Sequence, residues 1–143
     1  MIRLFVCALV LMAAACSSGN EVRKTPPPAA FNPEQFPDLP MPQGFIPKPG
    51  GDHLAVNMGG GAIRRYHVVL TQVDENTKLQ GDELEIWYQR RLAARGWELS
   101  LDQWPSRQEW VKAGASGTER LVLETGRADR RTIIRLVLTP TDG

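Results

Sequence analysis

The sequence predicts an α+β domain in which an antiparallel sheet of about five strands carries one main helix, in the order β-β-α-β-β-β. Three observations support this class. Apolar and polar residues alternate in several short segments, as they do in half-buried strands. One segment, residues 83–95, has apolar residues at helical spacing. Glycine-rich connections separate the strand-like segments, which is typical of hairpin turns.

The first two predicted strands are residues 53–57 and 63–72. In the second, Tyr66, Val68 and Leu70 alternate with polar or smaller residues. The three glycines at 59–61 lie between the two segments. A phosphate-binding loop needs a helix start after its glycines, usually with Lys, Ser or Thr, and the following residues do not supply one. We therefore interpret the glycines as a hairpin turn.

The main helix is predicted at residues 83–95. Asp82 is its expected N-cap, with Glu85 three residues later as in a capping box. Gly96 is expected to end the helix in the left-handed conformation, so that Trp97 folds back on the last turn in a Schellman motif. The apolar stripe of the helix contains Leu84, Trp87, Tyr88 and Leu92.

The remaining strands follow the helix. Residues 97–101 alternate as a half-buried strand, and Pro105 follows it. Ser106 and Glu109 suggest a short helical turn through Lys112. The last two predicted strands, 120–124 and 132–139, flank a hairpin connection at 126–129.

The N-terminus follows the plan of a signal peptide. Arg3 supplies positive charge, and the apolar stretch 4–15 is too short for a spanning helix, which needs about 20 residues. The segment Leu11-Met12-Ala13-Ala14-Ala15-Cys16 resembles the lipobox of bacterial lipoproteins, although Ala13 stands where that family prefers Leu. The resemblance implies cleavage before Cys16 and acylation of its sulfur, and Ser17 in place of Asp implies the outer membrane. The alternatives are an ordinary signal peptide cut near Ala15 and a cytosolic N-terminal helix.

A proline-rich linker is predicted between this anchor and the domain, so that residues 1–15 are signal peptide, 16–37 lipidated Cys16 and linker, and 38–143 domain. Nine of the eleven prolines lie between Pro26 and Pro49. Proline disfavours helix and sheet, so the segment is interpreted as a semi-stiff spacer; a proline-rich ligand for a partner groove is the alternative. We expect the apolar residues near its end to pack on the domain: Phe36, Leu39, Met41, Phe45 and Ile46.

The domain also resembles the globular part of uncharacterised bacterial lipoproteins that carry a P-x-P-x-G-F segment and a W/F-Y…G-W junction between helix and strand. The matching residues are Pro40, Pro42, Gly44, Phe45, Trp87, Tyr88, Gly96 and Trp97. The resemblance implies a fold over about residues 38–140 and transfers no catalytic residue. Relative to that pattern, residues 104–117 look like an insertion.

Composition excludes several kinds of chemistry. The formal charge of the whole chain is +1, which argues against nucleic acid as a partner. Cys7 leaves with the signal peptide and Cys16 is used for acylation, so no thiol remains for a disulfide, a cysteine metal site or a cysteine nucleophile. No serine has the context of a hydrolase nucleophile. We predict a protein that is not an enzyme and holds no cofactor.

Four tryptophans lie within 24 residues, and two of them are candidate contact residues. Trp87 and Trp97 belong to the predicted helix and its end. Trp104 and Trp110 flank the inserted segment and have no periodicity that places them in the core. Core packing is the default interpretation for a tryptophan, and the alternative is that these rings stack against a sugar or a partner surface.

Two weaker candidate sites complete the inventory. His53 and His67 lie on neighbouring predicted strands and are interpreted as ordinary strand histidines; the alternative is a zinc set with Asp52, which requires that their faces agree. The arginines near the last hairpin are interpreted as a solvated turn, and the alternative is contact with anionic lipid phosphates. These are Arg127, Arg130 and Arg131.

The sequence therefore predicts a lipoprotein anchored in the outer membrane and facing the periplasm. Its domain is expected to be a non-enzymatic binding or envelope-assembly module. The alternative is a periplasmic domain that binds a small ligand, a glycan or a metal. The expected partners are the membrane, through the N-terminal lipid, and an envelope protein or peptidoglycan.

Overall fold

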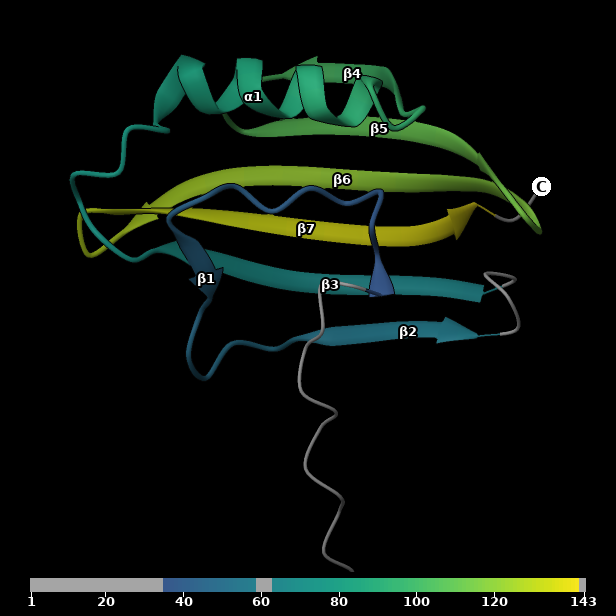
Figure 1. The fold of residues 1–143 in the computed structure, drawn as a ribbon, viewed down its shortest axis with the longest axis horizontal. Helices are drawn as coiled ribbons and strands as arrows, with labels where there is room; N and C mark the ends of the chain where they lie inside the picture. The colour runs from purple at the N-terminus through teal and green to yellow at the C-terminus, as the bar shows by residue number, and fades with distance from the viewer. Residues whose placement is uncertain (1–34, 59–62, 142–143) are drawn as a thin grey trace, which may run out of the picture.

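The computed structural model describes residues 35–58 and 63–141, in which seven antiparallel strands form one sheet with one helix (Figure 1). The strands are β1 (Phe45–Pro47), β2 (Leu54–Met58), β3 (Ile63–Gln72), β4 (Glu98–Gln103), β5 (Arg107–Gly114), β6 (Gly117–Ala128) and β7 (Arg131–Thr141). The helix is α1 (Gly81–Ala93). The sheet order is β1-β3-β7-β6-β5-β4, and β2 also pairs with β3. The predicted signal peptide, Cys16 and most of the predicted linker lie outside the described residues.

The predicted α+β class is confirmed, whereas the expected number of strands, about five, was too low. The largest difference is β5, where we expected a short helical turn. Gln108 and Trp110 are buried on one face of this strand, which pairs with β6 along its whole length. Ser106 does not cap a helix: its hydroxyl donates to the Gln103 carbonyl oxygen and closes the turn between β4 and β5.

The helix begins two residues earlier than predicted, and its start differs from the expected capping box. Gln80 is the N-cap, and its side chain makes no capping bond. The amide of Gln80 instead donates to the Thr77 carbonyl oxygen at 3.0 Å. The helix ends at Ala93, two residues before the predicted Arg95. The predicted terminating motif is confirmed: Gly96 has φ +81°, and the Trp97 N–H donates to the Leu92 carbonyl oxygen at 3.1 Å, as in a Schellman motif.

One face of the sheet is covered by α1 together with residues 35–44, which we call the strap (Figure 1). Most of the expected docking is confirmed, since Phe36 and Leu39 of the strap and Phe45 of β1 are buried in the core, and Phe36 is only 1% exposed. Phe36 precedes the predicted domain start at residue 38. Ile46 was expected to pack but is 44% exposed, because it alternates with Phe45 along β1.

Two further expectations about strands need correction. Leu99 is 41% exposed, although residues 97–101 were predicted to be half-buried with Leu99 inside. It lies on β4, which is an edge strand, and the register with β5 shifts between Leu99 and Leu101. The last hairpin turns at Asp129 and Arg130, with φ of 50° and 64°, and not over 126–129. In the part of the chain described here, no helix has the length and apolar character needed to cross a membrane.

Candidate functional site

On the face of the sheet that α1 and the strap cover, residues paired across neighbouring strands form rows. These rows are apolar in the middle of the sheet and polar at its two ends. Tyr66, Leu138, Leu121 and Trp110 form one apolar row, in register across β3, β7, β6 and β5. At one end of the sheet the series ends with the pair Lys112 and Glu119. At the other end it finishes with Arg127 and Thr132. Each polar end contains a distinct site.

A pocket of about 280 Å³ lies at the Arg127 end of the sheet, and we call it the Trp104 pocket. Its floor is the end of the β6–β7 hairpin, its walls are the first turn of α1 and the β4–β5 turn, and its lining is mostly apolar. The lining residues are Gly81, Leu84, Trp104, Pro105, Thr125, Gly126, Arg127 and Thr132. The pocket therefore joins three segments that are far apart in the sequence.

Side-chain hydrogen bonds fix the tryptophan wall of this pocket. The backbone N–H of Trp104 donates to Oδ1 of Asp102 at 3.3 Å, and the same oxygen accepts from Nε2 of Gln108 at 3.0 Å. The Thr125 hydroxyl donates to the Pro105 carbonyl oxygen and so connects the β4–β5 turn to the floor. Trp104 is half-buried and packs against the core. The wall is thus connected to β5 through Gln108 and to β6 through Thr125.

A buried glutamine supports the floor from below. Oε1 of Gln72 accepts from the Thr132 N–H at 2.8 Å. Nε2 of the same side chain points to the Leu79 carbonyl oxygen at 3.5 Å, in the segment that leads into α1. Gln72 is almost completely buried, so these contacts satisfy polar groups that would otherwise be costly. Through Gln72, the floor of the pocket is connected to the segment that leads into α1.

The electrostatics of the pocket are asymmetric. Arg127 is exposed, and no described residue that lines the pocket is acidic. Acidic side chains lie instead beside the first turn of α1. Burial raises the pKa of Glu85, and the negative charges of Asp102 and Asp82 raise it further. Positive charge therefore lies at the β6–β7 hairpin, and the nearby negative charges lie on the first turns of α1 and on β4.

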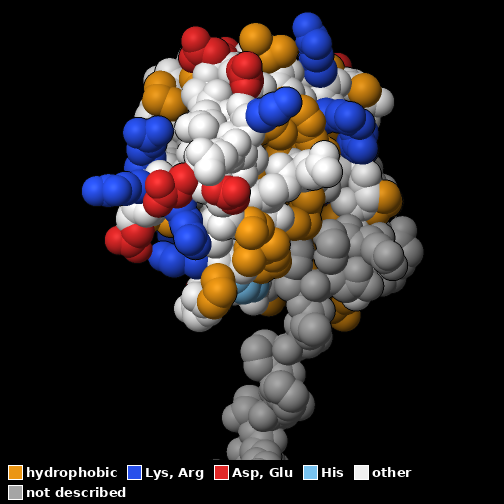
Figure 2. Space-filling model, turned by 60° about the vertical axis from the view of Figure 1, so that its left-hand side comes forward, with side chains coloured by type: hydrophobic (Ala, Val, Ile, Leu, Met, Phe, Trp, Pro, Cys, Tyr) orange, Lys and Arg blue, Asp and Glu red, His pale blue; other side chains and the backbone are white. Residues whose placement is uncertain are grey.

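The structure brings together two of the predicted contact residues and separates the others. Trp104 and Arg127 line the same pocket. The prediction that Trp110 is a contact residue is wrong: it is 2% exposed, because it faces the core beside Leu121. Arg130 lies at the hairpin turn, and Arg131 lines a different hollow with Lys48 and Ile133. Figure 2 turns this end of the molecule toward the viewer and shows hydrophobic side chains at the surface among charges of both signs.

The two histidines do not come together as a metal site. His67 pairs across the ladder with Leu54 and not with His53. Both ring nitrogens of His53 contact the backbone: Nε2 lies 2.9 Å from the Lys48 carbonyl oxygen, and Nδ1 accepts from the Val69 N–H at 3.4 Å. Within residues 35–58 and 63–141, no three His, Cys, Asp or Glu side chains are grouped so as to hold a metal ion.

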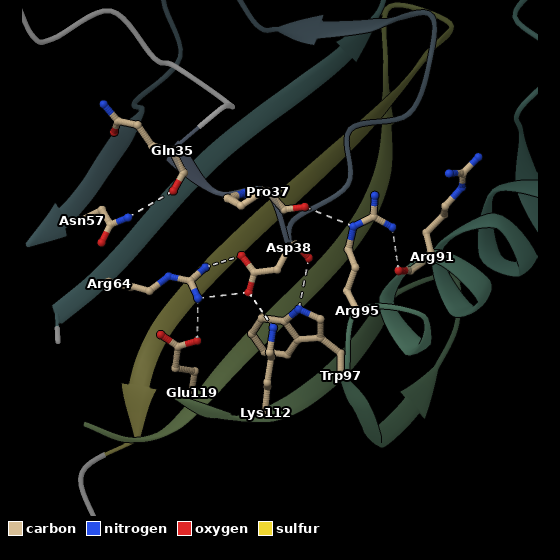
Figure 3. A network of polar contacts seen from close by, with 10 residues as sticks. All are labelled: Gln35, Pro37, Asp38, Asn57, Arg64, Arg91, Arg95, Trp97, Lys112 and Glu119. Carbon is tan, nitrogen blue, oxygen red and sulfur yellow. Dashed lines mark hydrogen bonds and ion pairs between the residues drawn. The ribbon is translucent and has the colours of Figure 1, made fainter. Parts of the chain in front are cut away.

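The opposite end of the sheet holds a charged network that we did not predict (Figure 3). The Asp38 carboxylate accepts from both terminal nitrogens of Arg64 and from Nζ of Lys112, which lies 3.1 Å away. Arg64 also contacts Glu119 at 3.0 Å. The backbone oxygen of Asp38 accepts from Nε1 of Trp97 at 3.2 Å. The network fastens the strap to β3, β5, β6 and the end of α1.

The two carboxyl groups of the network have opposite pKa shifts. Burial acts to raise the pKa of Asp38, but the hydrogen bonds and charges of Arg64 and Lys112 outweigh it, so the pKa is lowered. Burial raises the pKa of Glu119, and Arg64 only partly offsets this. The only sequence signal for the network was a single acidic residue, Asp38, within the apolar strap. The network fastens the strap to the sheet and to the end of α1.

Comparison of the chain with protein-family models, with curated proteins and with solved structures gives no match.

Proposed function

We propose that this chain is a bacterial lipoprotein, anchored in the outer membrane through acylated Cys16, whose α+β domain is a non-enzymatic binding module facing the periplasm. The anchor is supported by the lipobox-like segment that ends at Cys16 and by Ser17 after it. The proline-rich sequence that precedes the strap supplies the reach. The domain supplies the site.

The observation that carries the proposal is the Trp104 pocket. It places an aromatic side chain and an exposed arginine, from two separate hairpins, around one concavity. Its volume of about 280 Å³ is near the lower end of the range for ligand pockets, about 300–1,000 Å³. A pocket of this size suits one ring-sized group, such as a sugar unit of a polymer. Peptidoglycan is the glycan polymer that an outer-membrane anchor brings within reach.

Retention on purified peptidoglycan tests the proposal. The full-length chain is incubated with sacculi, and the bound fraction is measured after sedimentation as a function of sacculus concentration. Trp104→Ala should weaken retention at least about tenfold, which corresponds to about 1.4 kcal/mol and is typical of a buried aromatic contact. Trp87→Ala is the matched control, because Trp87 is also half-buried but lies on α1 in a separate hollow with Leu79 and Arg90.

Equal retention of the wild-type chain and Trp104→Ala would contradict this assignment of the site. If a pull-down from an envelope extract instead recovers a stoichiometric envelope protein, and Trp104→Ala abolishes that recovery, the domain is an assembly module. The anchor is tested separately: Cys16→Ser should abolish labelling with radioactive palmitate and release the protein from the membrane fraction. A variant that stays labelled and membrane-bound would refute the anchor.

A further inference from the structure

We propose that the Trp104 pocket binds a ring-sized group that carries a carboxylate, and that Arg127 is the residue that recognises the carboxylate. This inference rests on the proposed function, since it assumes that the pocket is the ligand site. It adds the charge of the ligand and the residue that selects for that charge.

The apolar lining determines which kind of chemical group fits the pocket. Leu84, Trp104 and Pro105 supply most of the walls, and Gly81 and Gly126 leave the floor and the entrance without side chains. Leu84 is fully buried, so it closes the pocket from below the helix. A ring with one apolar face would stack on such a surface and displace poorly bound water.

Arg127 determines the charge of the ligand. It is the one charged residue among the described lining residues, and it lies opposite Thr132 in the last row of the β6–β7 hairpin. No ion pair of Arg127 is found among the described side chains. The guanidinium is always charged and offers a planar fork of donors that matches a carboxylate. A single arginine suits a singly charged carboxylate, whereas a phosphate with two charges usually has more than one cation.

The other polar groups of the pocket leave Arg127 as the residue that determines the charge of the ligand. The Thr125 hydroxyl already donates to the Pro105 carbonyl oxygen, so it does not compete with Arg127 as a donor to the carboxylate. Asp82, in the first turn of α1, and Asp102, on β4, are not among the lining residues. Arg127 is therefore the charged side chain that a ligand in the pocket would meet.

Neighbouring arginines provide an internal control. Arg131 is exposed on the same hairpin and carries the same charge, but it does not line the Trp104 pocket. A general attraction of anions to this end of the molecule would depend on both residues. Recognition in the pocket depends on Arg127 alone.

The test uses a matched pair of probes, cyclohexanecarboxylate and cyclohexanecarboxamide, which share a ring and differ in charge. Each is titrated into the full-length ¹⁵N-labelled chain, and the indole N–H signal of Trp104, assigned with Trp104→Phe, is followed by NMR. The acid should bind at least about fivefold more tightly than the amide, as expected for one partly solvated charged hydrogen-bonding pair. Arg127→Gln should remove this preference, and Arg131→Gln should preserve it.

Equal binding of acid and amide, or a preference that survives Arg127→Gln, would overturn the inference while leaving Trp104-dependent retention on sacculi, and hence the proposed function, intact. Absence of any response to the acid up to about 20 mM would also overturn it. If retention on sacculi does not depend on Trp104, the proposed function fails instead.

A second comparison identifies the source of the carboxylate. Native sacculi are compared with sacculi whose carboxylates have been converted to amides. If amidation and Arg127→Gln each lower retention by a similar factor, the carboxylate belongs to the polymer. If the free acid binds through Arg127 and amidation has no effect, the ligand is a soluble acid.

Discussion

Replacement of Asp38 by asparagine should loosen the strap, because it removes the negative charge that faces Arg64 and Lys112 while keeping the shape of the side chain. Asp38 and Arg64 are each only 14% exposed, so water replaces the lost contacts poorly. Three hydrogen bonds end on this carboxylate, two from Arg64 and one from Lys112. After the change, Glu119 is the remaining described anion of the network.

The expected loss of stability lies between the values for surface and buried ion pairs. Exposed pairs contribute about 0–1 kcal/mol, whereas removal of one partner from a fully buried pair costs about 3–5 kcal/mol. The network is partly buried, and the asparagine oxygen still accepts from Arg64. We therefore expect Asp38→Asn to lower the free energy of unfolding by about 2 kcal/mol at pH 7. Asp52→Asn is the control, because Asp52 is exposed and should change stability by less than about 0.5 kcal/mol.

Urea unfolding of the full-length chain, followed by tryptophan fluorescence, measures this difference as a function of pH. The folded-state pKa of Asp38 lies below its ordinary value of 3.8, so its stabilisation is fully present above that value and is lost as the pH falls through the folded-state pKa. The gap between wild type and Asp38→Asn should therefore close in acid. Glu119 acts in the opposite direction, because its raised pKa makes the folded state bind a proton more tightly. Burial, the largest cause of the raised pKa of Glu119, is present in both proteins and cancels in the difference, whereas the charge of Asp38, which also raises that pKa, is absent from Asp38→Asn. The gap between the two proteins therefore reports the charge of Asp38 together with its effect on Glu119.

The reasoning about the network is refuted if Asp38→Asn unfolds at the same urea concentration as Asp52→Asn at pH 7. It is also refuted if the gap between wild type and Asp38→Asn stays constant down to the acid limit of folding. Either result would mean that apolar packing of the strap, and not its charge, holds it to the sheet.

Four other substitutions test the packing and the turns by the same unfolding assay. Arg130→Gly should raise the free energy of unfolding by about 0.5–1 kcal/mol, because Arg130 has φ 64° and glycine adopts that conformation without the steric cost; a decrease would contradict the assigned turn. Trp110→Ala should cost about 3–5 kcal/mol as a buried aromatic residue, whereas Leu99→Ala, 41% exposed, should cost well under half of that; similar costs would show that Trp110 is not in the core. Gly96→Ala should cost about 1 kcal/mol through its φ of +81°, and a neutral result would argue against the Schellman motif.

Local patterns predicted the helix and its end, since Gly96 and the spacing of Leu84, Tyr88 and Leu92 are sequence-local signals. The same reasoning failed at β5. Ser106 and Glu109 resemble a helix start, but pairing with β6 and the burial of Trp110 decide the conformation there. The helix start was missed because Gln80, which is not a usual capping residue, occupies the N-cap position.

The candidate site was predicted only in part. Trp104 and Arg127 were both selected from the sequence, yet their contact with one pocket depends on how two hairpins lie beside the start of α1. The Asp38 network was missed for a similar reason, because Arg64 and Lys112 are 26 and 74 residues away from Asp38 in the chain. Patterns of period two or 3.6 report which face a residue occupies. They do not report which distant segment meets it.

Retention of the full-length chain on peptidoglycan sacculi, compared for wild type, Trp104→Ala and Trp87→Ala, tests the central claim most directly. If the Trp104 pocket is the ligand site of a tethered binding module, Trp104→Ala weakens retention at least about tenfold and Trp87→Ala changes it by less than about twofold. If Trp104→Ala is retained as well as wild type, or if both variants lose retention equally, the pocket is not the site.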